Sequence, residues 1–250
     1  MQKSRKKSQD NKINILLTRP FKDSTKVSKA LNKNHFKAFI APLIEIRKKK
    51  YTFSLKRKFE FVIFTSRNAI FNFKESLNEN IRIITIGDGT YNLAKQMGMN
   101  NLINVKGNIE DLKRKMKSFL KVNSEIIHPT SPDYNNDLKD FFANIGCSYS
   151  PIFCYNSKLS NSRPEIFVNF FKSCKYGLIT LFSRRTAISF RNEIKKYGFV
   201  ENCKDKKILV LSKAIGDEVK GMKTNGLFIS KHPNERSMLD LIYEIKEKEF

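Results

Sequence analysis

Two similar stretches of the sequence, 59–73 and 176–190, show the clearest change from a strand pattern to a helix pattern. Each begins with β-branched and aromatic residues, breaks at a Ser-Arg pair, and continues with apolar residues at helical spacing. This order predicts a buried strand that leads into a helix through a short polar turn. The serines of the two turns, Ser66 and Ser183, are 117 positions apart. The sequence therefore predicts an internally duplicated chain.

The rest of the pattern repeats the alternation of strand and helix. Further strands are predicted at 13–17, 81–86, 102–105, 125–127, 208–211 and 227–230. Helices are predicted at 24–32, 91–97, 109–120 and 138–144, and from Ser237 onward. Extended segments that contain proline occupy matching places in the two halves, at 36–46 and 150–155. Strands that alternate with helices in this way predict parallel sheets covered by helices, in two copies.

The polar turns are the candidate binding positions. Backbone N–H groups and a hydroxyl at a helix N-terminus suit an anion, so we expect the turns at Ser66 and Ser183 to face one another and hold an acidic ligand. Gly87, after another strand, permits a positive φ and a close approach of ligand to backbone. Arg19 follows the first strand, at the end of the sheet where α/β proteins place ligands.

Composition limits the choice of partner. The chain has 250 residues and is 40% hydrophobic, which is enough for one large or two ordinary domains. Its net charge of +24 is compatible with nucleic acid, an anionic membrane or an acidic small molecule. The lysines are spread along the chain, and no zinc-finger, basic-zipper or RNA-recognition motif occurs, so an acidic small molecule is preferred over nucleic acid. Residues 1–12 form a basic tail that we predict to be disordered.

Cysteine usage and hydropathy predict a cytoplasmic setting. The four cysteines show no Cys-x-x-Cys spacing and no histidine at metal-ligand spacing, which predicts reduced thiols and no zinc site. No apolar run reaches the length of a membrane span, and the N-terminus lacks the apolar core of a secretion signal. No stretch reads as an exposed apolar strip, so we expect a monomer.

A series of short motifs resembles the uroporphyrinogen-III synthase family. Each motif alone is weak evidence, but together the motifs occur in the same order as in the family, from Ile15 to Leu239. The motifs are Leu16-Leu17-Thr18-Arg19-Pro20, Pro42-Leu43, Phe64-Thr65-Ser66-Arg67-Asn68-Ala69, Ile86-Gly87 with Thr90, Tyr155, Phe182-Ser183, and Pro233 with Leu239.

The resemblance implies an α/β fold of two flavodoxin-like parallel-sheet domains joined by a two-stranded β ladder. Domain 1 would then combine 13–41 with 156–250, and domain 2 would be 42–155. The ladder strands would be 42–46 and 151–155.

The resemblance also implies an activity. Members of the family cyclise hydroxymethylbilane to uroporphyrinogen III, with loss of water and inversion of the terminal pyrrole. They need no metal and no organic cofactor. The expected partner is therefore this small molecule, with neither nucleic acid nor membrane involved.

The resemblance also implies site residues. For each of them a simpler structural role would explain the same residue type. Tyr155 matches the family's recurrent tyrosine and is the candidate proton donor, although a tyrosine on a linker strand is about as often only packed. The candidate substrate-binding residues are Arg19, Thr65, Ser66, Gly87, Thr90, Ser183 and Arg184. Serine and threonine at such turns also cap helices, and surface arginines also form ordinary ion pairs. The three histidines are isolated in the sequence, and no catalytic part is predicted for them.

Two departures from the family pattern weaken parts of this assignment. The turn at 211–215 lacks the glycine and threonine of the first half. At 128–130 the chain has His-Pro-Thr, where Pro129 cannot donate an N–H, so this predicted turn would contribute less to binding. Two other functions stay open: a non-catalytic duplicated module that binds an acidic small molecule, and a basic nucleic-acid-binding protein with steep salt dependence.

Overall fold

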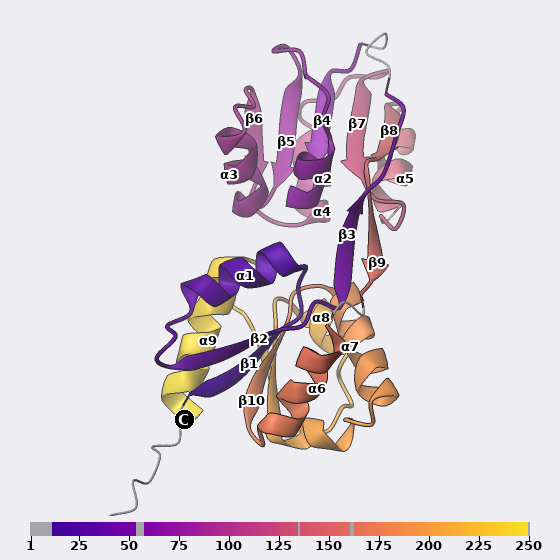
Figure 1. Cartoon of the computed structure of the whole chain (residues 1–250). Helices are drawn as coiled ribbons and strands as arrows, with labels where there is room; N and C mark the ends of the chain where they lie inside the picture. Colours follow the sequence, from indigo (N-terminus) through magenta and orange to yellow (C-terminus); the bar gives the residue numbers. More distant parts are fainter. Residues whose placement is uncertain (1–11, 54–57, 135, 161–162, 250) are drawn as a thin grey trace, which may run out of the picture. The chain divides into compact units, whose positions relative to one another are not determined.

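The structure is a computed structural model that describes residues 12–53, 58–134, 136–160 and 163–249. Contacts within the chain divide it into two compact units. Unit 1 falls within Met1–Glu45 and Leu159–Phe250, and unit 2 is the continuous segment Ile46–Lys158 (Figure 1). The tail predicted at 1–12 lies outside the described residues apart from Lys12.

Unit 2 is built on a five-stranded parallel sheet with the strand order β6-β5-β4-β7-β8. The strands are β4 (Phe61–Phe64), β5 (Arg82–Ile86), β6 (Leu102–Val105), β7 (Glu125–Thr130) and β8 (Ser148–Phe153). One face is covered by α2 (Arg67–Asn72) and α3 (Asp88–Gln96), and the other by α4 (Ile109–Met116) and α5 (Asp137–Asn144). Because β4 is covered on both faces, all four of its residues are apolar and buried.

Unit 1 has a parallel sheet of the same size, in the order β12-β11-β10-β1-β2. Its strands are β1 (Ile13–Leu17), β2 (Phe36–Ile40), β10 (Gly177–Leu181), β11 (Lys206–Val210) and β12 (Leu227–Ile229). Helices α1 (Phe21–Ala30) and α9 (Glu235–Glu249) pack on one face. The opposite face carries α6 (Pro164–Ser173), α7 (Arg184–Lys196) and α8 (Lys213–Asp217).

The two sheets share one strand order once the chain is read as two halves. In unit 1, β1 and β2 precede β10, β11 and β12, which gives the flavodoxin-like order 2-1-3-4-5. In unit 2, β7 and β8 take the places of β1 and β2, but they follow β4, β5 and β6 in the chain. Each half thus gives two strands to one unit and three to the other. The predicted fold class, two parallel-sheet α/β units with an internal duplication, is confirmed.

A two-stranded ladder is formed by β3 (Ile44–Lys48) and β9 (Tyr155–Leu159). The backbone bonds from Lys49 N to Cys154 O and from Ser160 N to Leu43 O flank it in an antiparallel register. The strands begin later than the predicted 42–46 and 151–155. Pro151 belongs to β8 instead, because β8 is an edge strand and tolerates a missing N–H.

Several predicted boundaries are also corrected. Helix α3 begins at Asp88, before the predicted 91, so Thr90 lies inside the helix and not in a turn. Strand β7 continues to Thr130, so the predicted turn at 128–130 is strand. Pro129 is accommodated there because the pairing of β7 with β4 ends at Ile127. Helix α6 was not predicted from the sequence, although its buried residues Phe167, Phe170 and Phe171 lie on one face and its exposed polar residues on the other.

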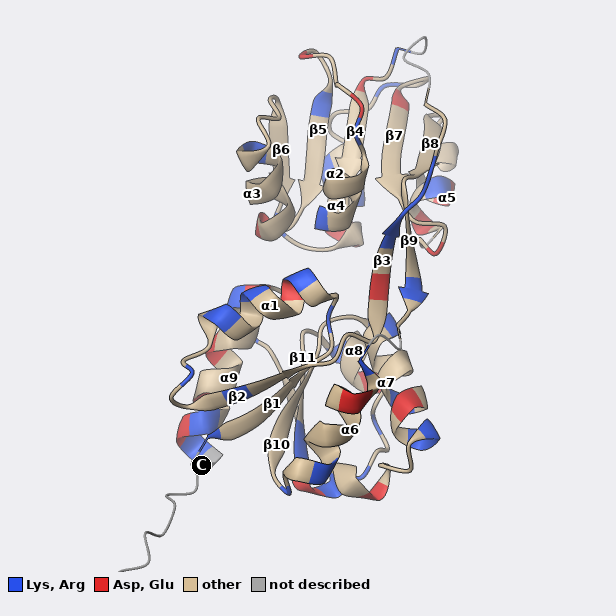
Figure 2. Cartoon of the chain, viewed as in Figure 1, with Lys and Arg blue, Asp and Glu red and all other residues tan. Residues whose placement is uncertain are grey.

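Charge is distributed over both units. Figure 2 shows Lys and Arg on helices of each unit and on both strands of the ladder. Within the described residues, none of the helices combines the length and apolarity needed to cross a bilayer.

Lys206, at the start of β11, is a lysine buried in unit 1, with 1% of its surface exposed. Its ammonium donates hydrogen bonds to the carbonyl oxygens of Cys174 (2.9 Å), Lys175 (2.6 Å) and Asn202 (3.4 Å). Burial lowers the pKa of the Lys206 ammonium. The lysine therefore supplies hydrogen-bond donors to the carbonyl oxygens of the two residues that follow α6, close to a helix end where carbonyl groups lack partners within the helix.

We expect Lys206→Met to lower the free energy of unfolding of unit 1 by about 3 kcal/mol, because buried carbonyls would lose a charged donor. Amide hydrogen exchange of β10 and β11 measures this loss. The matched control is Lys204→Met at an exposed position, which should change little. Equal protection in the two variants would show that Lys206 does not anchor this region.

Candidate active site

The candidate site of unit 2 lies where the sheet changes direction, between β4 and β7. From β4 the chain proceeds outward to β5 and β6 and then returns to β7 on the other side of β4. The paired residues run only to Val62 and Ile127, although β7 continues to Thr130. Parallel α/β sheets bind ligands beyond the carboxyl ends of strands at such a switch point. The residues that follow β4 and end β7 therefore form the candidate site.

Tyr155 belongs to a hydroxyl cluster at this point. Its phenol is hydrogen-bonded with Ser66, which follows β4, and with Ser131, which follows β7. Because Ser66 also accepts a bond from Asn68 N (3.1 Å), its own hydroxyl hydrogen is available to Tyr155. Burial raises the pKa of the Tyr155 phenol, and the two serine hydrogen bonds oppose that rise. The phenol is thus neutral at pH 7, with two hydroxyls placed to stabilise its phenolate.

A second hydrogen-bonded group joins the same two strands. Thr65 Oγ1 lies 3.0 Å from His128 Nε2, and His128 Nδ1 lies 2.6 Å from the hydroxyl of Tyr149 on β8. His128 is 2% exposed, and burial lowers its pKa to about 3. The imidazole is therefore neutral at physiological pH. Its two nitrogens bridge a strand-end hydroxyl and a phenol.

Two predicted binding residues lie at α3. Gly87 precedes the helix with φ +78°, and a Cβ placed there would meet no atom within 4 Å. The positive φ explains the glycine and leaves the backbone open. Thr90, in contrast, is buried inside the helix, with 6% of its surface exposed.

Unit 1 holds the other three predicted residues, and each has partners in its own unit. Arg19 donates to Glu235 (2.7 Å) and Asp23 (3.1 Å), and its guanidinium lies 4.5 Å from the centre of the Phe182 ring. Arg19 therefore links β1, α1 and α9.

The second polar turn of unit 1 is engaged in a similar way. Ser183 caps α7 by accepting from Thr186 N (3.1 Å). The exposed Arg184 donates two bonds to Glu218, at 2.8 Å from Nε and 2.5 Å from Nη2. Both residues thus also fit the simpler explanations of a helix cap and an ion pair.

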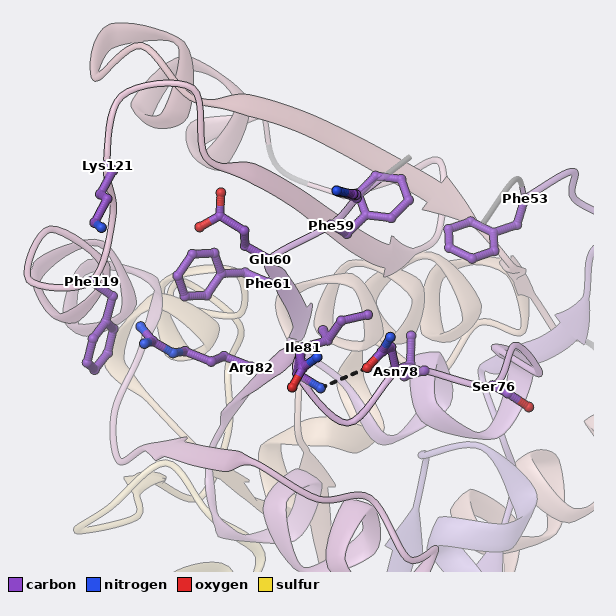
Figure 3. Close-up of a pocket in the computed structure, with 13 residues that line it drawn as sticks. Phe53, Phe59, Glu60, Phe61, Ser76, Asn78, Ile81, Arg82, Phe119 and Lys121 are labelled. Atoms are coloured by element: carbon purple, nitrogen blue, oxygen red, sulfur yellow. Dashed lines mark hydrogen bonds between the residues drawn. The ribbon is translucent and has the colours of Figure 1, made fainter. Parts of the chain in front are cut away.

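A cavity of about 860 Å³ lies at the other end of the unit 2 sheet (Figure 3). Glu60, Phe61 and Arg82, at the starts of β4 and β5, line it together with Phe119 and Lys121. Ligands in parallel α/β sheets bind beyond the carboxyl ends, so this cavity does not coincide with the candidate site. Phe53 and Lys58, which also line it, flank in sequence the residues 54–57 that the structure does not describe.

Sequence reasoning missed His128, Ser131 and Tyr149. His128 was judged isolated because neighbours in the sheet are distant in the chain. Ser131 could have been found from the strand order, since it follows β7 just as Ser66 follows β4. Tyr149 carried no signal, because a tyrosine on an edge strand is ordinary. Within the described residues, no group of His, Cys, Asp or Glu side chains is arranged to hold a metal ion.

Comparison with known proteins identifies the family. Residues 25–240 match the model of the family described as Uroporphyrinogen-III synthase HemD. The chain belongs to the uroporphyrinogen-III synthase family. The resemblance drawn from the sequence motifs is thereby confirmed, and it assigns the chain to a family of porphyrin biosynthesis. A comparison with curated proteins gave no match.

Solved structures of uroporphyrinogen-III synthases show the same fold. The synthetase from Helicobacter pylori aligns with a TM-score of 0.58 at 14% identity, over 94% of this chain and 99% of that one. A mutant synthase from Thermus thermophilus aligns with a TM-score of 0.57 at 11% identity, over 95% of this chain and 100% of that one. At these low identities the alignments support the fold alone. The candidate site is supported by the distances and hydrogen bonds within unit 2.

The lowered pKa of His128 predicts a pH dependence of stability in unit 2. Its folded pKa, about 3, is below the unfolded value of about 6.5, so below pH 6.5 only the unfolded chain gains a proton. Stability should therefore fall as the pH drops, by about 2 kcal/mol between pH 8 and pH 5 from this group. Hydrogen exchange of the β4 and β7 amides at several pH values measures it.

His128→Gln should remove this contribution and flatten the profile. His35→Gln is the matched control, because His35 is exposed and its substitution should leave the profile unchanged. Identical profiles for wild type and His128→Gln would contradict the assignment of a buried, neutral imidazole.

Proposed function

We propose that the protein is a uroporphyrinogen-III synthase that cyclises hydroxymethylbilane, with inversion of the terminal pyrrole and release of water. Family membership supports the reaction class. The observation that supports the reaction most directly is the Tyr155 phenol, hydrogen-bonded with Ser66 and Ser131 at the switch point of unit 2. It supplies a protonated donor at the end of the sheet where ligands bind.

Tyr155 would assist the departure of the terminal hydroxyl. In this step the C–O bond breaks, the hydroxyl takes a proton and leaves as water, and the electron pair of the pyrrole nitrogen stabilises the remaining carbon. The raised pKa keeps the phenol protonated at pH 7, and the hydrogen bonds with Ser66 and Ser131 oppose the rise and make the proton easier to transfer. Ser66 and Ser131 would then stabilise the negative charge that develops on the Tyr155 oxygen.

Hydroxyl and backbone groups would bind the acetate and propionate carboxylates of the substrate. Thr65, Ser66 and the open backbone at Gly87 lie at the ends of neighbouring strands in unit 2. Helix α2, however, has only six residues, so the hydroxyls matter more than its dipole.

The remaining predicted residues are less well placed for this task. Thr90 is as buried as Tyr155 but lies inside α3, which follows β5, and not at the switch point between β4 and β7, so the binding set proposed here does not include it. Arg19 and Arg184 would each have to exchange a protein carboxylate for one of the substrate. Ser183 would have to bind substrate while capping α7.

We also propose that the enzyme is a monomer that works in a reducing, cytoplasmic setting. All four cysteines are free thiols, and burial raises the pKa of each. Raised pKa values keep the thiols protonated and slow to oxidise. Light scattering of the purified protein tests the oligomeric state.

The test of the function is to supply hydroxymethylbilane, oxidise the products and separate the ring isomers. Faster closure that yields the inverted isomer III is expected. Isomer I alone, at the spontaneous rate, would reject the synthase and leave a non-catalytic module that binds acidic molecules. Binding to nucleic acid with a steep salt dependence would favour the third alternative.

Tyr155→Phe should lower kcat for isomer III about 100-fold or more, because the donor to the leaving hydroxyl is lost. The fold should persist, since the ring remains to pack in its apolar cluster. Tyr197→Phe is a matched control, because Tyr197 is a half-buried tyrosine of unit 1 that packs near Phe167. Full activity of Tyr155→Phe would remove the proton-donor assignment while leaving the family membership intact.

A further inference from the structure

The hydrogen bonds of Thr65, His128 and Tyr149 fit either tautomer of a neutral His128 ring, and their lengths favour one of the two. The 2.6 Å between Tyr149 Oη and His128 Nδ1 is shorter than N–H···O bonds usually are and suits an O–H donor. The 3.0 Å between His128 Nε2 and Thr65 Oγ1 is ordinary for an N–H donor. In the favoured tautomer Tyr149 donates to Nδ1, and Nε2–H donates to Thr65. A neutral imidazole carries one N–H, as this assignment requires.

The position of the Tyr149 hydroxyl is fixed by its neighbours. Its ring stacks on that of Phe142, with centroids 5.2 Å apart and an interplanar angle of 18°. Tyr134 packs edge-on to the imidazole of His128, at 5.9 Å. Burial raises the pKa of Tyr149, so its hydroxyl keeps its proton and stays a donor. Thr65 and Tyr149 are both partly exposed, and Thr65 directly follows β4 at the carboxyl end of the sheet.

These directions determine what Thr65 can do. Because its oxygen accepts from His128, its hydroxyl hydrogen is left to donate elsewhere. Among the described residues, His128 is the one hydrogen-bond partner of the Thr65 side chain. The neighbouring residue Ser66 bonds to Tyr155, so Thr65 is one position along the chain from a partner of the proposed proton donor.

We propose that His128 and Tyr149 are positioning residues that hold the Thr65 hydroxyl as a hydrogen-bond donor to a carboxylate of the substrate. This inference rests on the proposed function for the nature of the ligand. It gives His128 a neutral role: the imidazole selects the direction of a hydrogen bond and transfers no proton. Without Tyr149, Nδ1 can carry the proton and Nε2 can accept from Thr65, which turns the Thr65 hydrogen away from the ligand.

The tautomer can be observed without any substrate. Nitrogen NMR of the histidine side chains at pH 7 should show that His128 is protonated at Nε2 and unprotonated at Nδ1. Assignment is direct, because the chain has three histidines and His128→Gln removes one signal. Protonation at Nδ1 would overturn the proposal. In Tyr149→Phe the population of the Nδ1–H tautomer should rise.

Substrate affinity gives the second readout. Tyr149→Phe and Thr65→Val should each raise KM for hydroxymethylbilane about tenfold, with kcat within about twofold, since a bond to a charged group is lost. The double variant should be no worse than Thr65→Val alone, because both act on one hydroxyl. Thr65→Ser should restore the wild-type KM. Tyr134→Phe is the matched control, because Tyr134 meets His128 through its ring.

The outcomes separate this proposal from a purely structural role and from the proposed function. A Tyr149→Phe protein that is less stable but has an unchanged KM would overturn the proposal. If the isomer assay fails, binding of uroporphyrin III, a stable octacarboxylate tetrapyrrole, replaces KM. If Tyr149→Phe then binds uroporphyrin III about tenfold more weakly than the wild type, the positioning role is supported even though the synthase activity is not. Equal binding by the two proteins would reject the positioning role.

Discussion

The arrangement of unit 2 depends on the early end of the pairing between β4 and β7. Paired strands satisfy their polar backbone groups with one another, but beyond Val62 and Ile127 this ladder stops while both strands continue. Side chains bridge the parting strands instead: Thr65 reaches His128, and Ser66 shares the phenol of Tyr155 with Ser131. A buried polar side chain without a partner is costly, and here the hydroxyls and the imidazole are partners of one another. Hydroxyl and imidazole side chains are thereby collected at the carboxyl end of the sheet, the end where parallel α/β sheets bind ligands.

The two units use different side chains to connect the central strands at the carboxyl ends of their sheets. In unit 1, the corresponding strands β1 and β10 remain linked by Thr18, which donates to Thr180 O, and by Thr180, which donates to Leu16 O. Arg19 is then held by two carboxylates and an aromatic ring. Charged groups there are neutralised within the unit, whereas the unit 2 site is built from neutral hydroxyls and a neutral imidazole. Duplication has preserved the strand order and left the side chains at the switch points free to diverge.

The sequence predicted the fold better than it predicted the site. Runs of β-branched residues, the Ser-Arg turns and the family motifs were sufficient for the two parallel sheets and the serine N-caps of α2 and α7. Pro151 misled the placement of the ladder, because a proline on an edge strand looks like a proline in a linker. His128 was dismissed because a hydrogen bond to Thr65, 63 positions away, leaves no trace in local spacing. Residue types and strand ends are local information, but the partner of a buried polar group is decided by tertiary contacts.

The exchange of strands between the two halves has a consequence for synthesis on the ribosome. Unit 2 is one uninterrupted segment, so its sheet can assemble as soon as Lys158 has emerged. The first two strands of unit 1 emerge earlier but must wait for β10, since the bond from Thr18 to Thr180 spans 162 positions. Until then β1 presents an unpaired apolar edge, the kind of surface that chaperones and aggregating partners recognise. Unit 1, whose first strands are synthesised before any strand of unit 2, is therefore the last unit to be completed.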